Sequence, residues 1–412
     1  MIQFEKHTLS NGLRVVINRD ATTALCAVNI VYNVGSKLEN PMKTGFAHLF
    51  EHLMFGGTKA IPSFDLPLQF AGGDNNASTN SDLTNYYDIL PAQNIETAFW
   101  LESDRMRELD FSEKSLKVQK KVVIEEFRET CLEEPYGDVW HHLGQMAYKT
   151  HPYKWPTIGQ EISHIKEITL LDVKDFFYTY YRPNNAVLSI SGNVDVDKTM
   201  RLVENYFGEI PRGKDNSNTI PSEPKQSTFN EKILYANVPH DAIFRAYHMD
   251  SRYADQFYAA DFISDILASG RSSRFYKRLF KEKQMFNIID AFVSGTIDPG
   301  LIVLEGHLNP GVDMDTARNA IMLEIEILKQ DGITDQELQK LKNTVETSIA
   351  FSEVNILNKA ISLGYYEITA EANLINTEIE KYFKLTKEDI QQTAQELFTD
   401  ENCNELCYLK IT

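Results

Sequence analysis

Two histidines and a glutamate fall within one short apolar segment of the sequence. Residues 48–52 read HLFEH, which places His48 and His52 four residues apart with Glu51 between them. On a helix, residues four apart share a face, so the two imidazole rings can point to one place, and Glu51 flanks the same face. A single histidine on an apolar helix usually belongs to the core. This spacing, however, is His-x-x-Glu-His, the inverted form of a zinc-peptidase motif.

The chemistry that this pattern predicts is metal-assisted hydrolysis. Imidazole nitrogens bind zinc well, and a catalytic zinc site uses three protein ligands and keeps a fourth position for water. A carboxylate that lies beside the metal without binding it can take a proton from that water and pass it to a leaving group. We therefore expect one Zn²⁺ per subunit, with His48 and His52 as metal ligands and Glu51 as the catalytic base.

The third ligand must come from another element, and residues 112–130 (SEKSLKVQKKVVIEEFRET) predict a suitable helix. The inward stripe of this helix runs through Leu116, Val123 and Phe127. At about 100° per residue, Glu126 lies roughly 70° from the centre of that stripe, Glu129 roughly 130° and Glu125 nearly opposite. A glutamate on a charged helix usually faces solvent, but Glu126 borders the buried face. We therefore expect Glu126 to be the third metal ligand.

The composition limits the class of protein. The chain has 412 residues, and 41 basic against 59 acidic residues give a formal charge of −18, which argues against a nucleic-acid partner. Apolar runs stay below membrane-spanning length. Residues 1–20 read as strand, Asn-Gly turn and strand without the apolar core of a signal peptide, so we expect a cytoplasmic protein and no membrane partner. Cys403 and Cys407 lie in an apolar run, which favours a strand over a metal site.

The chain reads as two similar halves, separated by a polar, proline-containing stretch at residues 210–227. Each half has a strand that leads into a helix, and each closes with a helix, a turn and an apolar strand. We therefore predict an α+β fold made of a duplicated unit of sheet and packed helices. The expected parts are a catalytic, zinc-binding domain at 1–212, a linker at 213–227 and a homologous domain without a metal site at 228–412.

The second half lacks the polar constellation of the first. The predicted helix of each half ends in one of two similar segments, HLMFGG and DILASG, and these two segments can be aligned. The same helix is therefore expected to form without the two histidines and the glutamate, so the fold alone does not require them. The aligned pairs are His48 with Asp261, Glu51 with Ser264 and His52 with Asp265.

These motifs resemble the pitrilysin/insulinase family of zinc metallopeptidases, which includes the mitochondrial processing peptidase. The resemblance covers essentially the whole chain. GFAHLFEHLMFGGT is similar to the zinc helix of the family, and VVIEEF to the segment that carries its distal glutamate ligand, which falls on Glu126. AGGDNNASTNSDLTNYYDILP resembles the substrate-binding strand, and YYRPNNAVLSISGNVD resembles the strand that closes the N-terminal half.

The resemblance implies two homologous α/β roll domains, each a mainly antiparallel sheet packed with helices. In short-chain members, two such subunits form a clamshell that encloses an extended peptide. The resemblance also places Asn76, Ala77 and Ser78 along the substrate. A polar edge strand of this kind can pair with a peptide through main-chain hydrogen bonds, although an ordinary solvent-facing edge strand has the same pattern.

Two departures from the family pattern matter. The spacing from His52 to Glu126 is a few residues shorter than usual, and Glu129 would fit the longer spacing. Active relatives often carry an arginine and a tyrosine, seven residues apart, that reach the substrate and the tetrahedral intermediate. The matching segment here is LFKEKQMFN, in which Phe280 and Asn287 take these two places. Neither side chain can donate a charged hydrogen bond to an oxyanion.

Three explanations of the second departure stay open. The alignment could be shifted by a few residues, or Arg271, Arg274 or Tyr276 could substitute locally. Alternatively, the chain works as one half of a heterodimer, in which a zinc-less homologous subunit supplies the arginine and the tyrosine. In each case we expect a dimer, formed either by two identical subunits or by two different ones.

The sequence thus predicts a zinc-dependent endopeptidase or oligopeptidase acting on extended peptides. One alternative is a non-catalytic structural subunit of the same fold, but such subunits typically lose the zinc motif, which is intact here. The other is a zinc-regulated peptide-binding module, which would not need Glu51.

Overall fold

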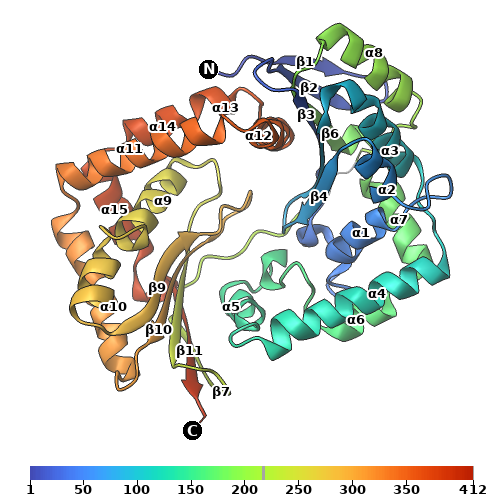
Figure 1. Ribbon diagram of the computed structural model, residues 1–412. Helices are drawn as coiled ribbons and strands as arrows, with labels where there is room; N and C mark the ends of the chain where they lie inside the picture. Colours follow the sequence, from blue (N-terminus) through green and yellow to red (C-terminus); the bar gives the residue numbers. More distant parts are fainter. Residues whose placement is uncertain (216–218, 412) are drawn as a thin grey trace. The chain divides into compact units, whose positions relative to one another are not determined.

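The computed structural model describes residues 1–215 and 219–411, and its packing divides the chain into two compact units (Figure 1). The first unit comprises Met1–Arg128, Trp155–Pro221 and Ile349–Thr377. The second comprises Glu129–Lys154, Ser222–Ser348 and Glu378–Thr412. Among the described residues, no helix has both the length and the apolar character needed to cross a membrane.

A six-stranded sheet forms the centre of the first unit. Its strands are β1 (Glu5–Thr8), β2 (Arg14–Arg19), β3 (Leu25–Tyr32), β4 (Asp74–Thr79), β5 (Thr84–Pro91) and β6 (Ala186–Gly192). Their order is β1-β2-β6-β3-β5-β4, and all neighbours are antiparallel except β2 and β6. The predicted Asn-Gly turn joins β1 to β2, where Gly12 has a φ of +91° that glycine adopts without strain. Strand β4 lies at the sheet edge, as its polar alternation predicted.

The helices of the first unit position the candidate site. Helix α1 packs on α4 and on the edge strand β4. The helical segments are η1 (Ser36–Leu38), α1 (Phe46–Phe55), α2 (Asp65–Phe70), η2 (Ala92–Asn94), α3 (Ile95–Arg107), α4 (Glu113–Phe127), α6 (Ile162–Glu167), α7 (Leu170–Tyr180), η5 (Pro183–Asn185), α8 (Val196–Phe207), α12 (Ile356–Thr369) and α13 (Leu374–Thr377).

Helix α12 comes from the C-terminal half of the sequence, but it packs against β3 and β6 of the first sheet. The Oγ of Ser189 on β6 donates a hydrogen bond to the carbonyl of Ala360, at 2.7 Å. Gly364 passes so close to the sheet that an added Cβ would lie 2.6 Å from that Oγ. The small residues of α12 therefore allow the helix to cover a fully buried part of the sheet.

A five-stranded sheet forms the centre of the second unit. Its strands are β7 (Asn230–Ala236), β8 (Ala242–His248), β9 (Phe286–Val293), β10 (Leu301–Leu308) and β11 (Cys403–Lys410). Most or all of each of these helical segments belongs to this unit: η3 (Arg128–Glu133), α5 (Val139–Ala147), η4 (Pro152–Lys154), α9 (Asp255–Ala268), η6 (Phe275–Glu282), α10 (Met314–Asp331), α11 (Asp335–Ser352), α14 (Ile379–Lys384), α15 (Lys387–Leu397) and η7 (Asp400–Asn402).

The two sheets share one topology. The second sheet has the order β7-β11-β8-β10-β9, which repeats the order β2-β6-β3-β5-β4 of the first. In both orders the first pair, β2 with β6 and β7 with β11, is parallel and the other pairs are antiparallel. The predicted fold class, two homologous α+β domains with mainly antiparallel sheets and packed helices, is therefore confirmed.

The packed units do not coincide with the contiguous division expected at 1–212 and 228–412. Residues 129–154 pack in the second unit, because α5 lies on β8 and β11, and residues 349–377 pack in the first through α12. The boundaries 1–212 and 228–412 describe the two homologous halves of the sequence, and they remain a prediction. The predicted linker at 213–227 includes 216–218, which lie outside the described residues, and its other residues form neither helix nor strand.

Candidate metal centre

Helix α1 is a core helix that begins at a glycine. Gly45 precedes the helix with a φ of +83° and, being glycine, has no side chain that could cap it. Instead, the buried carboxyl group of Glu39 accepts hydrogen bonds from the backbone nitrogens of Gly45 at 3.0 Å and Ala47 at 2.7 Å. Burial raises the pKa of Glu39 to about 8. The buried apolar face that holds the helix in place consists of Phe46, Ala47, Leu49, Phe50, Leu53 and Met54.

Helix α4 presents Glu126 to α1. Ser112 caps its N-terminus by accepting a hydrogen bond from the nitrogen of Ser115 at 3.2 Å, in agreement with the predicted helix start. The buried residues are Leu116, Val123, Ile124 and Phe127. The side chain of Glu126 is 37 % exposed and reaches both histidines, whereas that of Glu125 is 61 % exposed and pairs with Arg128. Glu129 is exposed.

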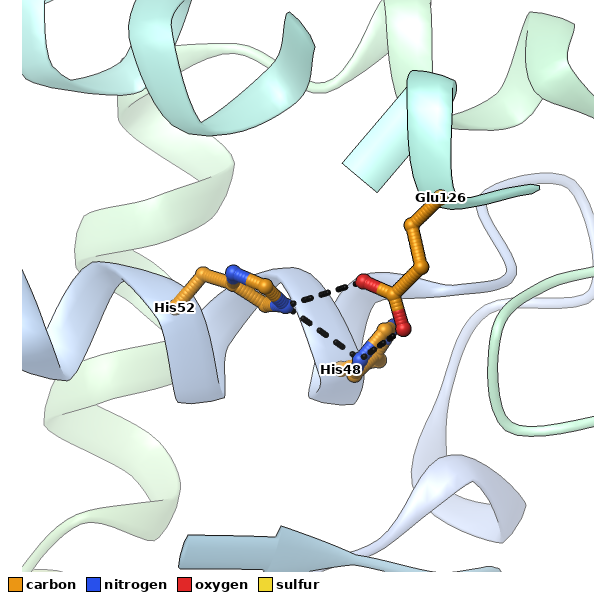
Figure 2. A group of neighbouring side chains, drawn as sticks. All are labelled: His48, His52 and Glu126. Carbon is orange, nitrogen blue, oxygen red and sulfur yellow. Dashed lines mark hydrogen bonds and ion pairs between the residues drawn. The ribbon is translucent and has the colours of Figure 1, made fainter. Parts of the chain in front are cut away.

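The side chains of His48, His52 and Glu126 converge on one point, as Figure 2 shows. The two Nε2 atoms lie 3.3 Å apart. The Nε2 of His52 is 3.3 Å from Glu126 Oε2, and that of His48 is 3.5 Å from Oε1. Ligand atoms bound about 2.0–2.1 Å from a tetrahedral zinc lie about 3.3–3.4 Å from one another. The two Nε2 atoms therefore already have the spacing of two corners of a zinc tetrahedron, and each lies a similar distance from one oxygen of Glu126.

The protonation states favoured at this site suit a metal ligand set. Burial is the main cause that lowers the pKa of His48, which favours its neutral, metal-binding form. A hydrogen bond from His52 is the main cause that lowers the pKa of Glu126, which favours the carboxylate. Within the described part of the chain, these three residues form the only group of three or more His, Cys, Asp or Glu side chains arranged to hold a metal ion.

Glu51 lies on the same helix but outside the ligand group. Its Oε2 accepts a hydrogen bond from the Oγ1 of Thr79, the last residue of β4. Sequence analysis did not identify Thr79 or Glu39 as site residues. Thr79 directly follows the predicted substrate-binding residues, but its contact with α1 depends on how the strand packs on the helix. For Glu39 the sequence carries no signal that we recognise.

The predicted peptide-binding residues lie on the edge strand β4. Asn76 and Ser78 are exposed, while Ala77 and Thr79 point to the opposite face of the strand and are half-buried. The backbone nitrogen of Ala77 donates to the side-chain Oδ1 of Asn76 at 2.8 Å. Because β4 has a sheet neighbour on one side only, its other edge offers main-chain groups to an extended chain.

The residues that replace the arginine and tyrosine of the family lie in the second unit. Phe280 stacks on Tyr276 with ring centroids 5.1 Å apart. The side-chain nitrogen of Asn287 donates to the carbonyl of Leu308 at 3.3 Å. Both interactions are made within the second unit.

Two other groups of the second unit bear on the sequence predictions. Arg274, one of the suggested local substitutes, is bound by Glu337 through two hydrogen bonds of 3.0 and 3.1 Å. Cys403 and Cys407 are buried free thiols on β11, as the strand interpretation predicted.

The His-x-x-Glu-His motif on α1 is the signature of the inverzincin class of proteins, and here it lies in one of two matching α+β units. Comparison with family models agrees with that class. Residues 14–161 match the model described as insulinase (peptidase family M16), and residues 167–345 match the model described as the peptidase M16 inactive domain. The chain belongs to the M16, or insulinase, family of peptidases, as its motifs indicated.

Relatives of similar length span nearly the whole chain. It is 28 % identical over 403 residues to zinc protease PqqE of Helicobacter pylori, which covers 96 % of this chain and 90 % of that protein. It is 24 % identical over 412 residues to the uncharacterized zinc protease YmxG of Bacillus subtilis, with 96 % of each covered. It is 25 % identical over 405 residues to the beta subunit of the mitochondrial-processing peptidase of Saccharomyces cerevisiae, with 93 % and 86 % covered.

Solved structures share the fold. The crystal structure of a protease from Helicobacter pylori superposes with a TM-score of 0.93 at 26 % identity and covers 99 % of both chains. Pitrilysin superposes with a TM-score of 0.79 at 17 % identity, covering 99 % of this chain but 45 % of that one. The first half of the periplasmic protease PqqL from Escherichia coli gives a TM-score of 0.77 at 18 % identity and covers 98 % and 92 %.

Proposed function

We propose that this protein is a zinc-dependent endopeptidase or oligopeptidase. The observation that carries the proposal is the convergence of the side chains of His48, His52 and Glu126 on one point, with Glu51 on the same helix but outside the ligand group. Relatives named zinc proteases support hydrolysis of peptide bonds as the reaction. Zinc held by these three groups would act as a Lewis acid and keep one coordination position open.

The remaining steps fall to side chains of this chain. Glu51 takes a proton from the attacking water and later returns it to the leaving amine, which a carboxylate outside the metal shell can do. The neutral imidazoles of His48 and His52 and the single carboxylate of Glu126 leave a bound divalent ion with net positive charge. That charge favours a substrate whose carbonyl oxygen gains negative charge during the attack.

Strand β4 is the proposed docking site of the substrate. A peptide that pairs with its free edge is held through main-chain groups near Asn76, Ala77 and Ser78, so binding depends little on the peptide sequence. The packing of α1 on β4 places that edge strand beside the helix of the metal ligands. The expected substrate is therefore an extended or unstructured peptide.

The decisive experiment compares the wild-type protein with Glu51→Gln. The wild-type protein should contain about one zinc per subunit and hydrolyse unstructured peptides, and the activity should disappear with a chelator and return with zinc. The variant should keep its zinc and lose about a hundredfold or more in turnover, because general base catalysis contributes about 10²–10⁴-fold. Equal turnover of the two proteins would reject the proposal and leave a zinc-regulated binding module or a structural subunit.

The proposed assembly contains two M16 subunits around the peptide. A relative is named as a subunit of the mitochondrial-processing peptidase, and this chain covers less than half of pitrilysin and of full-length PqqL. Phe280 and Asn287 cannot stabilise an oxyanion by a charged hydrogen bond, and Arg274 is bound by Glu337. We therefore infer that a homologous subunit without the zinc motif supplies the missing arginine and tyrosine.

The assembly is tested by solution mass and by rate. Alone, the chain should bind zinc yet cleave peptides slowly, since the loss of one oxyanion donor costs roughly a hundredfold. Addition of a zinc-less paralogue should raise turnover while the zinc content stays fixed. A homodimer with full activity that no paralogue changes would contradict the heterodimer and return Arg271 and Tyr276 to consideration.

A further inference from the structure

A hydroxyl group links the proposed base to the proposed substrate strand. Thr79 is the last residue of β4, and its Oγ1 donates a hydrogen bond to Oε2 of Glu51 on α1. Thr79 is half-buried on the same face of β4 as Ala77. The contact therefore joins a strand and a helix through two residues that are 28 positions apart in the sequence.

The end of β4 is held firmly at this point. The Oδ1 of Asn80 accepts hydrogen bonds from the backbone nitrogens of Asp82 and Leu83, both at 2.8 Å, which close the turn into β5. The carbonyl of Asn80 also accepts a hydrogen bond from the nitrogen of Ser36 at 3.2 Å. Thr79 thus precedes a turn that is fixed both by the side chain of Asn80 and by a hydrogen bond from the loop before α1.

An unrestrained glutamate has three rotatable side-chain bonds, so the direction of its carboxylate is not set by the helix alone. A donor from a fixed strand restricts these rotations and occupies one carboxylate oxygen. The other oxygen, Oε1, is left available to take a proton. The same strand would pair with the peptide, so both the carboxylate of Glu51 and the scissile bond would be positioned by β4.

We propose that Thr79 is a positioning residue: its hydroxyl orients the carboxylate of Glu51 and keeps it in register with a peptide bound on β4. This inference rests on the proposed peptidase function. The peptide itself binds through main-chain groups of the strand and not through the hydroxyl of Thr79. Removal of the hydroxyl should consequently affect turnover more than substrate binding.

The test uses Thr79→Val, which keeps the shape of the side chain and removes the donor, and Thr79→Ser, which keeps the donor. In the active assembly, Thr79→Val should lower kcat about tenfold, a part of the contribution of a general base, and change KM by less than about twofold. Thr79→Ser should stay within about threefold of the wild type in kcat. Both variants should keep the wild-type zinc content, because Thr79 is not a ligand.

A second measurement does not depend on activity. In crystals of the metal-free protein, the carboxylate of Glu51 should lie beside residue 79 in the wild type and in Thr79→Ser. In Thr79→Val it should adopt another rotamer or become disordered. An unchanged Glu51 rotamer in Thr79→Val, an unchanged kcat, or a higher KM at unchanged kcat would each overturn the positioning role.

The failures of the two proposals are distinguishable. If Glu51→Gln keeps full turnover, the proposed peptidase function is wrong. If Glu51→Gln loses turnover while Thr79→Val does not, the peptidase function stands and the role of Thr79 is wrong.

Discussion

Helices α1 and α9 occupy corresponding places in the two units but treat their polar side chains differently. In α9, Asp261 accepts a hydrogen bond from the hydroxyl of Tyr382 at 2.7 Å, and Ser264 donates to the carbonyl of Asp261 at 2.8 Å. Each polar group is satisfied by a neighbour, as buried polar groups of a core usually are. In α1, by contrast, His48 and His52 share one space with Glu126.

The carboxyl groups near the two helices differ in the same sense. Burial is the main cause that raises the pKa of both Asp261 and Asp265, which favours their neutral forms. The pKa of Glu126 is instead lowered, mainly by the hydrogen bond from His52. One fold thus carries two versions of the same helix, and only the version in the first unit gathers groups in the form that binds a cation.

The largest expected difference between the helices is in metal and activity. His48→Ala or His52→Ala should abolish stoichiometric zinc and lower peptide hydrolysis at least about a thousandfold, because either change leaves two protein ligands. The matched changes Asp261→Asn and Asp265→Asn in α9 should keep about one zinc per subunit. Elemental analysis and peptide assays check both. Stoichiometric zinc in either histidine variant would remove the metal assignment from α1.

The next largest effect concerns the glutamates of α4 and its continuation. Glu126→Gln should weaken zinc binding by about a hundredfold or more, since even groups outside the ligand shell change metal affinity by about 10–100-fold. Glu125→Gln and Glu129→Gln should change it by less than about threefold, because both side chains are exposed. Competition with a chromogenic chelator measures the affinities. If Glu129→Gln is the variant that loses zinc, the longer family spacing was the better guide.

Core substitutions should show that both helices support the fold to a similar degree. Leu49 in α1 and Phe262 in α9 are fully buried. Leu49→Ala should lower the free energy of unfolding by about 2–5 kcal/mol and Phe262→Ala by about 3–5 kcal/mol. Denaturant unfolding of the metal-free protein measures both, and of the two only Leu49→Ala should also weaken zinc binding. Equal zinc affinity in the two variants would contradict the separation of roles.

The smallest effect is a pH dependence at the start of α1. The pKa of Glu39 is raised to about 8 by burial, so the folded protein holds a proton that the unfolded chain, with a pKa of about 4.5, releases. Its contribution to stability is present below the unfolded pKa and is lost as pH rises through about 8. The free energy of unfolding should therefore fall between pH 5 and 8 by at most a few kcal/mol, and by less in Glu39→Gln.

The matched control for Glu39 lies at the start of α9. Asp255 is exposed there and forms an ion pair with Lys381, which lowers the pKa of Asp255. Asp255→Asn should leave the slope between pH 5 and 8 unchanged, because this group titrates at lower pH. Parallel stability curves for wild-type protein and Glu39→Gln would show that Glu39 does not hold the proton.

The sequence predicted the parts of the site that depend on one element at a time. The spacing of His48, Glu51 and His52 is set within one helix, and the position of Glu126 at the border of the buried face follows from the apolar stripe of another. The repeated pattern of strands and helices also predicted that the chain consists of two similar α+β units. Each of these features depends on periodicity, which the chain displays locally.

The contacts that the sequence did not predict join elements across packing interfaces. The hydrogen bond from Thr79 to Glu51 requires the depth at which β4 meets α1, and the cap that Glu39 places on α1 requires the path of the preceding loop. Helix α12, which comes late in the sequence, packs on the sheet formed by the first part of the chain. Such arrangements depend on side-chain volumes and backbone geometry that no local pattern encodes.

The position of α12 has a consequence for fragments of the gene. A fragment that ends at residue 212 would encode the complete His-x-x-Glu-His motif and the distal glutamate, yet it would lack the helix that covers β3 and β6. Asn29 and Ser189, which are fully buried beneath α12, would then face water together with the apolar strands around them. The duplicated halves are thus no longer separable modules, and a soluble N-terminal fragment would require the 349–377 segment supplied in trans or fused to it.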